Sequence, residues 1–214
     1  MAHRGRFITL EGGEGVGKST LAAALALQLA AKGVEVVRTR EPGGSPGAET
    51  LRRLILNPPD DVGGWNTVSE ALLFYAARSD HLDRTIRPAL ARGTWVICDR
   101  FSDSTRAYQV AAGGVVPEHF DALERMCVGA DGPDLTLVLD LSMDIARTRM
   151  NARSAAQDAI ESRDLAYHAA VHQAFLDIAR ANPQRCLVLD ASASPESLAQ
   201  DALAEITRRF PEVR

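Results

Sequence analysis

A glycine-rich segment near the start of the chain has the residue types needed to bind phosphate. Gly12 to Ser19 match the pattern G-x-x-x-x-G-K-[ST], in which glycines let backbone N–H groups point at phosphate oxygens. Lys18 supplies positive charge for the β- and γ-phosphates, and the Ser19 hydroxyl can reach Mg²⁺. The segment therefore predicts a site for nucleotide phosphates that comprises Gly12, Gly13, Glu14, Gly15, Val16, Gly17, Lys18, Ser19 and Thr20.

The residues on either side of this segment supply the elements that must position it. Phe7 to Leu10 form a short apolar run that predicts a buried strand. Residues 20–31 are rich in strong helix formers. Their leucines repeat at the spacing of one helical face, at Leu21, Leu25 and Leu29. The order strand, loop and helix favours a phosphate loop over an incidental glycine-rich turn.

Charged residues end three further predicted strands. The strand at 34–40 leads into Arg40-Glu41-Pro42-Gly43-Gly44, and the strand at 94–100 ends in Asp99-Arg100. The strand at 135–141 ends in Asp140. Either aspartate could serve as the carboxylate beside the metal, and Asp140 could instead cap the next helix. Since open parallel sheets bind ligands at the carboxyl ends of their strands, these residues are expected at one edge.

One long helix, or two abutting helices, is predicted over residues 67–91. The core stripe is expected at Leu72, Leu73, Ala76 and Ala77. A second face carries residues at helical spacing: Glu70, Phe74, Arg78 and His81. This second face fits a solvated surface as well as it fits a base-binding surface, in which Phe74 stacks on a flat ring and Arg78 contacts its edge.

The remaining pattern defines the fold class. Helices are expected at 48–56, 102–111 and 144–153, then up to about residue 181 and after Ser194-Pro195, with a fifth strand at 185–190. Five strands alternating with helices predict an α/β, P-loop three-layer fold with a five-stranded parallel sheet flanked by helices and right-handed crossovers. Residues 1–214 are expected to form a single domain.

The composition excludes several classes of protein. A net charge of −4 argues against a nucleic-acid surface, and no apolar stretch is long enough to span a membrane. The first residues lead directly into the first strand without a signal sequence. The cysteines are far apart, at Cys98, Cys127 and Cys186. Buried thiols in a cytoplasmic protein are expected rather than disulfides or a metal site.

Together these segments resemble the thymidylate kinase family. The matching stretches follow the family order over nearly the whole chain: residues 7–20, 39–44, 73–78, 99–100, 104–109 and 133–140. Many enzymes share the phosphate loop. The combination of Arg-Glu-Pro-Gly-Gly, Phe-Tyr-Ala-Ala-Arg and Ser-Thr-x-Ala-Tyr-Gln is much more specific to this family.

The resemblance implies the reaction ATP + dTMP → ADP + dTDP with Mg²⁺, in a homodimer. Ser19 and Asp99 would contact the metal. Gly15 stands where another branch of the family carries a loop arginine, so the chain looks like the bacterial type. In that type the catalytic arginine comes from a lid after the fourth strand, here about residues 147–163.

The resemblance also implies a dTMP site. Phe74 would stack on thymine, and Tyr108 would lie where a ribose 2′-hydroxyl would intrude. Arg52 and Arg100 would hold the dTMP phosphate, and Glu14 would face its sugar. The polar edge of thymine would be contacted by Arg78, Ser104, Thr105 and Gln109. The predicted catalytic residues are Lys18, Glu41, Arg100, Arg149 and Arg153, of which Glu41 orders the acceptor end of the site.

Two positions depart from the family pattern. Phe101 follows Asp99-Arg100 where Tyr or His is more usual, and Ala159 replaces the arginine of the usual Asp-Arg-x-Glu lid sequence. Because neither Gly15 nor Ala159 supplies positive charge, we expect Arg153 to be the main lid arginine. Arg149, one helical turn away, would support it, and Arg163 is a weaker candidate.

Three other functions compete with this interpretation. A GTPase switch is disfavoured, because the D-x-x-G match at residues 61–64 follows a Pro-Pro loop and no N-K-x-D-like segment is present. A non-catalytic nucleotide-binding protein is suggested only by Ala159. A kinase for another nucleoside monophosphate is the third alternative, and turnover with a panel of monophosphates would separate it from the others.

Overall fold

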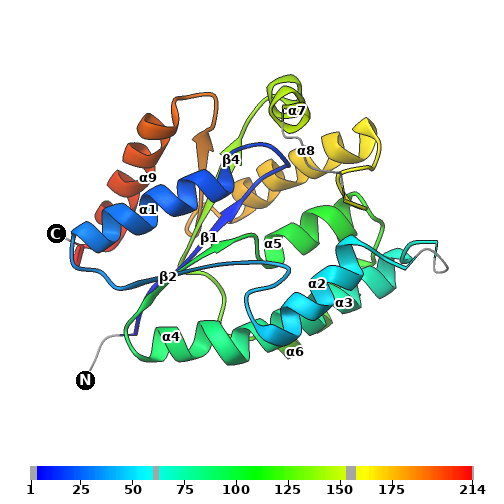
Figure 1. The fold of residues 1–214 in the computed structure, drawn as a ribbon, viewed down its shortest axis with the longest axis horizontal. Coiled ribbons are helices and arrows are strands. Elements are labelled where there is room, and N and C mark those ends of the chain that lie inside the picture. The colour runs from blue at the N-terminus through cyan, green and yellow to red at the C-terminus, as the bar shows by residue number, and fades with distance from the viewer. Residues whose placement is uncertain (1–3, 60–62, 153–157, 214) are drawn as a thin grey trace.

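The five predicted strands form one parallel sheet in a computed structural model that describes residues 4–59, 63–152 and 158–213. The strand order is β2-β3-β1-β4-β5, with the crossovers that a doubly wound sheet requires. The strands are β1 (Phe7–Glu11), β2 (Val36–Arg40), β3 (Trp95–Asp99), β4 (Leu135–Asp140) and β5 (Cys186–Asp190). The predicted fold class is confirmed, and β1, which carries the phosphate loop, lies at the centre of the sheet (Figure 1).

Helices cover the sheet on both faces. They are α1 (Lys18–Ala31), α2 (Pro46–Leu56), α3 (Thr67–His81), α4 (Arg87–Ala91), α5 (Ser102–Thr105), α6 (Pro117–Cys127), α7 (Met143–Asn151), α8 (Leu165–Ala181) and α9 (Pro195–Arg209). Two π-helical segments, η2 (Leu82–Ile86) and η3 (Arg106–Ala111), continue α3 and α5. Figure 1 shows α1 and α9 side by side on one face, with α3, α4 and α6 on the other. The sequence interpretation did not include α6.

The alternation of side chains along the strands explains the two layers. Ile8 and Leu10 are fully buried in a core formed with α1 and α9. Phe7 and Cys98 point to the opposite face and pack against η2, α4 and α6. Because both faces are covered, the central strands β1, β3 and β4 are apolar almost throughout, as expected of a parallel sheet. The three cysteines are free, and Cys98 and Cys186 are buried, as predicted.

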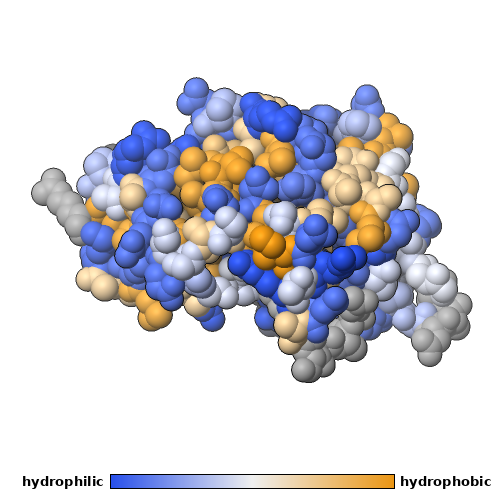
Figure 2. Space-filling view, turned by 90° about the horizontal axis from the view of Figure 1, so that it is seen from above, coloured by the Kyte–Doolittle hydropathy of each residue, from blue (hydrophilic) through white to orange (hydrophobic). Residues whose placement is uncertain are grey.

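The surface of the described residues combines charged and apolar side chains. Figure 2 shows the molecule from above the view of Figure 1, where separate apolar patches lie among polar side chains. Within the described residues, no helix combines the length and the apolar character needed to cross a membrane.

The core stripe predicted for α3 is confirmed at Ala77, which is buried, and wrong at Leu72 and Ala76, which are exposed. Leu72 is 51% exposed, whereas Ala71 and Tyr75 are buried. The ring of Tyr75 packs edge-on against Phe120 of α6, at 5.9 Å between centroids. Because the unpredicted α6 packs on α3, it changes which face of α3 is covered. The alternative of a solvated second face is also wrong, since its polar residues are buried: Glu70, Arg78 and His81.

Candidate active site

A cleft of about 330 Å³ opens at the carboxyl ends of the central strands. Its walls come from the phosphate loop after β1, from the turns that follow β2 and β3, and from α3 and η3. Most of the predicted site residues line it, namely Glu14, Gly15, Gly17, Lys18, Ser19, Thr20, Glu41, Arg52, Phe74, Arg78, Asp99, Arg100, Ser104, Thr105, Tyr108 and Gln109. The fold thus brings together segments that are more than ninety residues apart in the sequence.

The phosphate loop holds its lysine against its own backbone. Lys18 Nζ donates hydrogen bonds to the carbonyl oxygens of Gly13 (2.6 Å) and Gly12 (3.2 Å). Gly15 and Gly17 have φ values of 72° and 100°, which L side chains rarely adopt. Burial and the nearby charge of Arg100 lower the pKa of Lys18 to about 8. A phosphate group in the loop would offer Lys18 anionic acceptors in place of these carbonyls.

The two strand-ending aspartates differ in their partners. The Ser19 hydroxyl donates to Asp99 Oδ2 at 2.6 Å, beside the phosphate loop. Asp140 instead lies 2.7 Å from the His172 ring nitrogen Nε2, on the side of α8. Asp140 also makes no cap, since the residue at the N-cap of α7 is Ser142. The hydroxyl and carboxylate of Ser19 and Asp99 are hard oxygen ligands of the kind that Mg²⁺ prefers.

Arg100 is the centre of a buried polar cluster beneath the phosphate loop. Its φ of 69° makes it the one non-glycine residue with positive φ among those described. Arg100 Nη1 donates to Gly12 O (2.9 Å) and Ser104 Oγ (3.1 Å). Nη2 donates to Glu14 Oε1 (2.6 Å) and to the Tyr108 hydroxyl oxygen (3.0 Å). The guanidinium is therefore fixed toward the cleft despite a backbone conformation that is strained for an arginine.

Charge governs the ionisation of Glu14 in this cluster. Burial alone would raise the pKa of Glu14, but the positive charges of Arg100 and Lys18 and a hydrogen bond from Tyr108 outweigh it. The result is a pKa lowered to about 2. Glu14 is therefore a carboxylate at neutral pH, and it accepts from Tyr108 at 3.0 Å as well as from Arg100.

Glu11 is a polar residue of the site that the sequence interpretation missed. This last residue of β1 is fully buried, and it accepts from Phe101 N (2.8 Å) and from Ser104 Oγ (2.6 Å). Burial and the negative charge of Asp103 raise the pKa of Glu11 to about 8. The available signal was a glutamate at the end of an apolar strand, directly before the phosphate loop. Ser104, expected at the base edge, thus connects Glu11 to Arg100.

The other end of the cleft is aromatic and cationic. Phe74 and Arg78, one turn apart on α3, both line it. Arg78 is 1% exposed, and its Nη2 donates to Thr105 Oγ1 at 3.0 Å. Among the described residues, Arg78 Nη1 has no hydrogen-bond partner. Phe101 lies 5.1 Å from the guanidinium carbon of Arg78, so phenylalanine is accommodated beneath it at this position.

Glu41 orients Arg78 from the opposite side. Glu41 Oε2 accepts from Arg78 Nε at 2.8 Å, and Glu41 Oε1 lies 3.0 Å from His81 Nδ1. The other ring nitrogen of His81 lies 2.7 Å from Thr39 Oγ1. Both Glu41 oxygens are therefore engaged, and this residue acts on the cleft through Arg78. Arg52 also lines the cleft, with Nη1 donating to Pro42 O at 2.7 Å.

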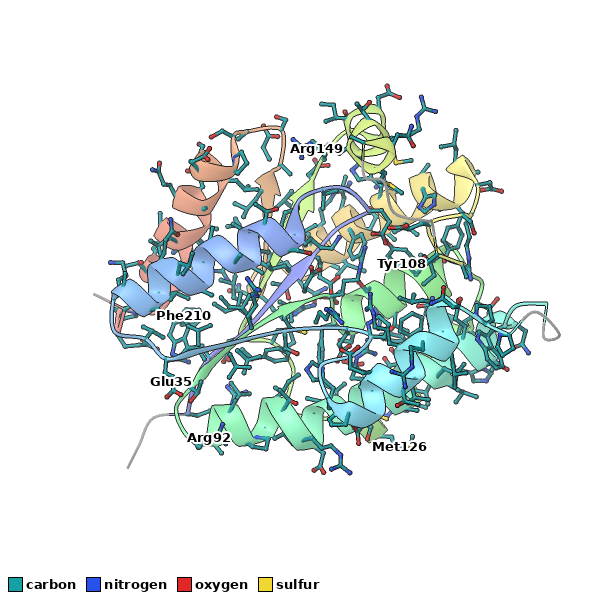
Figure 3. All side chains as sticks on the ribbon, viewed as in Figure 1. Glu35, Arg92, Tyr108, Met126, Arg149 and Phe210 are labelled. Atoms are coloured by element: carbon teal, nitrogen blue, oxygen red, sulfur yellow. The ribbon has the colours of Figure 1, made fainter. Side chains whose placement is uncertain are left out.

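A second hollow lies on the other side of the phosphate loop and contains Arg149. Arg149 reaches from α7 to the loop between β5 and α9, where its Nη1 lies 3.4 Å from Ala191 O (Figure 3). Gly15, Gly17 and Thr20 line both this hollow and the main cleft. Arg149 itself does not line the main cleft. Its predicted catalytic role stays a prediction, as does that of Arg153, which lies outside the described residues.

The lid region meets the site in two places. A Cβ atom at Gly15 would lie 2.6 Å from Ala146 O of α7, so this loop position has no room for a side chain. Arg163, the weaker lid candidate, pairs with Glu70 at 2.7 Å and does not line the main cleft. Asp158 and Ile160, on either side of Ala159, line the cleft.

These features define a class of enzyme. A phosphate loop after the central strand of a parallel sheet, a hydroxyl–carboxylate pair beside it and a cleft with an aromatic, cationic end are the parts of a P-loop nucleotide kinase. Comparison with known proteins gives the family. The family model for thymidylate kinase matches residues 10–202.

Individual relatives agree with the family model. A thymidylate kinase of Bradyrhizobium sp. (strain ORS 278) is 49% identical over 207 residues, which cover 94% of this chain and 91% of that protein. A thymidylate kinase of Caulobacter vibrioides is 50% identical over 195 residues, covering 91% and 92% of the two chains. The crystal structure of thymidylate kinase from Ehrlichia chaffeensis superposes with a TM-score of 0.77 at 31% identity, covering 95% and 99%. The chain belongs to the thymidylate kinase family, and it is therefore an enzyme that phosphorylates dTMP.

Proposed function

We propose that this enzyme transfers the γ-phosphoryl group of ATP to dTMP, with ATP and dTMP on opposite sides of the phosphate loop. The observation that carries this proposal is that Gly15, Gly17 and Thr20 line two hollows at once. A triphosphate that crosses the loop has its base in the hollow beside Arg149. Its γ-phosphate then faces the main cleft, where Lys18 and Arg100 lie.

dTMP would bind in the main cleft. Phe74 stacks on the thymine ring, and Arg78 donates to an acceptor on the base. Arg52 and Arg100 hold the phosphate of dTMP between base and loop. Tyr108 and Glu14 face its sugar, and their mutual hydrogen bond leaves little space for a 2′-hydroxyl.

The residues present also fit a magnesium ion. Ser19 Oγ and Asp99 Oδ2 are 2.6 Å apart at the start of α1 and offer hydroxyl and carboxylate oxygens. Bound there, Mg²⁺ supplies positive charge for the phosphate oxygens as their charge shifts during transfer. Lys18 adds a fixed charge on the other side of the same phosphates. The predicted lid arginine Arg153 would add the remainder, whereas Arg149 lies in the hollow proposed for the ATP base.

We also propose that the enzyme is a homodimer that associates through α3. Val68 and Leu72 are one turn apart on α3 and are 52% and 51% exposed. Met126 of the adjoining α6 is 74% exposed (Figure 3). Apolar side chains that cluster on one exposed helical face favour burial against a second protein surface.

Turnover of a panel of monophosphates tests the proposed reaction. Coupled ATP consumption is measured with dTMP, dUMP, dCMP and AMP, with and without Mg²⁺. We expect dTMP to have the highest kcat/KM, because a site that hydrogen-bonds one base edge leaves its own groups unpaired with another base. Equal kcat/KM for dTMP and AMP would show that the acceptor site is assigned wrongly.

A further inference from the structure

The buried carboxylate of Glu70 joins two side chains that come from different elements. Glu70, on α3, is 3% exposed, and both of its oxygens are engaged. Its Oε2 accepts from Gln109 Nε2 of η3 at 3.0 Å. Its Oε1 accepts from Arg163 Nη2, at 2.7 Å, just before α8. The guanidinium of Arg163 also lies over the Tyr167 ring, 4.6 Å from its centre.

This contact determines which way the Gln109 amide is turned. A carboxylate beside a guanidinium can only accept hydrogen bonds, whereas a glutamine amide has a donor end and an acceptor end. The NH₂ group of Gln109 must therefore face Glu70, and its carbonyl Oε1 is turned the other way. Among the described residues Oε1 makes no hydrogen bond, and Gln109 lines the main cleft.

The cleft therefore presents an acceptor and a donor to the base. The acceptor is Gln109 Oε1, and the donor is the guanidinium of Arg78, which lines the cleft and whose Nη2 is bound to Thr105. Thymine and uracil carry an N3–H donor beside the O4 acceptor. Cytosine carries the reverse, an N3 acceptor beside an N4 amino donor. The arrangement matches thymine and uracil and opposes cytosine.

We propose that Glu70, held by Arg163, is a specificity-determining positioning residue that fixes the Gln109 carbonyl toward the base. The inference rests on the proposed dTMP site and deepens it. It also assigns Arg163 to base selection and not to phosphoryl transfer. Glu70 touches neither the base nor the reacting phosphates; it acts through the orientation of Gln109.

A purely structural function of Glu70 makes a different prediction. As a brace between α3, η3 and α8, Glu70 would change the turnover of all pyrimidine substrates by the same factor. As an orienting group, it changes the ratio of dUMP to dCMP. These two nucleotides share the sugar, the phosphate and the absence of the thymine methyl group, and they differ only in the edge that Gln109 faces.

The experiment compares Glu70→Gln with wild type for dTMP, dUMP and dCMP at saturating ATP. The introduced amide can donate or accept, so the Gln109 amide can take either orientation. We expect kcat/KM for dTMP and dUMP to fall about tenfold, while kcat/KM for dCMP stays the same or rises. The Gln109 carbonyl is then no longer fixed toward the base, where it opposes cytosine. The dUMP-to-dCMP ratio should therefore fall at least about tenfold.

Glu124→Gln is the matched control. Glu124 is also a glutamate that accepts a hydrogen bond from α3, from the Tyr75 hydroxyl at 2.7 Å, but it does not line the cleft. The dUMP-to-dCMP ratio of kcat/KM in Glu124→Gln should stay within about twofold of wild type. A ratio within twofold of wild type in a folded Glu70→Gln protein would overturn the inference. A wild type that does not distinguish dUMP from dCMP would instead overturn the proposed base site itself.

Arg163→Ala provides a second test that does not alter the buried carboxylate. Arg163 is partly exposed, so its removal should leave the fold intact. We expect the dUMP-to-dCMP ratio to fall several-fold and Arg163→Lys to restore most of it, since lysine keeps a cation beside Glu70. If the ratio is unchanged in Arg163→Ala, or if kcat falls equally for all three substrates, Arg163 does not act through Glu70.

Discussion

Glu14 Oε1 accepts hydrogen bonds from both Arg100 Nη2 and the Tyr108 hydroxyl, so the phosphate loop and the turn after β3 share one ion pair. The Arg100–Glu14 pair thus connects the phosphate loop, which would hold ATP, to η3, which would contact dTMP. Its members are mostly buried, with 15% and 19% of the Arg100 and Glu14 side chains exposed.

This pair predicts a specific dependence of stability on pH. The pKa of Glu14 is lowered from its ordinary value of 4.5 to about 2. The ionised carboxylate therefore stabilises the fold above pH 4.5, and this contribution is lost as the pH falls toward 2. A shift of this size corresponds to roughly 3 kcal/mol of unfolding free energy. Glu14→Gln should lose most of it at neutral pH.

The measurement is urea unfolding of wild type and Glu14→Gln at pH 7 and pH 3. Other acidic groups titrate in both proteins, so they cancel in the difference between the two unfolding free energies. We expect that difference to be smaller at pH 3 than at pH 7. A difference that does not change with pH would show that Glu14 is not held ionised by Arg100.

Lys18→Met should abolish turnover and leave the fold intact. The Lys18 ammonium group is the fixed cation of the phosphate loop, and losing such a group costs roughly 10²–10³-fold in kcat or more. Lys32→Met is the matched control, because Lys32 is the chain's other lysine and lies exposed at the end of α1. Near wild-type kcat in folded Lys18→Met would contradict the assigned phosphate loop.

Alanine substitutions of the two lid arginines should affect different kinetic parameters, KM for ATP in one case and kcat in the other. Arg149 lies in the hollow proposed for the ATP base, so Arg149→Ala should raise KM for ATP roughly tenfold by removing a cation–π contact. Arg153→Ala should instead lower kcat by roughly 10³-fold or more, as loss of an arginine that stabilises the transferring phosphoryl does. Initial rates at varied ATP and saturating dTMP measure both quantities.

Arg147→Ala is the control for this pair. Arg147 lies on α7, as Arg149 does, and makes an exposed 4.0 Å ion pair with Asp144. Such a pair is worth at most about 1 kcal/mol of stability and should not affect the rate. A fall in kcat for Arg149→Ala without a change in KM would place Arg149 at the phosphoryl group. Unchanged kcat in Arg153→Ala would remove it from the catalytic residues.

Leu72→Glu should yield monomers if the enzyme dimerises through α3. A charge placed on the apolar face of α3 cannot be buried against a second chain without a large desolvation cost. Leu27→Glu, at a position 74% exposed on α1, controls for the added charge. Sedimentation velocity gives the mass of each variant. A Leu72→Glu protein that sediments like wild type would exclude this face.

The sequence predicted the sheet and the order of the site segments well, because strong local patterns encode them. The phosphate loop is a contiguous motif, and β1 and β3, which lead into the site, are short apolar runs that end in an acidic residue. Glu70, Phe74, Arg78 and His81 could be placed on one face by helical spacing. Their burial could not be predicted, since it depends on η3 and on the turn after β2, which are distant in sequence.

The errors have a common physical origin in tertiary packing. The core stripe of α3 was partly misplaced because α6 covers a side of α3 that spacing alone did not identify. The hydrogen bond from Ser104 to the buried carboxylate of Glu11 could not be predicted either, because it joins residues 93 positions apart. Asp140 and Asp99 were equivalent in sequence, and only the sheet order places Asp99 next to Ser19.

The close approach of Ala146 O to Gly15 lets α7 pack directly against the phosphate loop. Gly15 has no Cβ, so the carbonyl oxygen of Ala146 can approach the loop closely. A side chain at position 15 would clash with this oxygen and displace α7. In this chain the position of α7 relative to the phosphate loop therefore depends on the absence of a single methyl group.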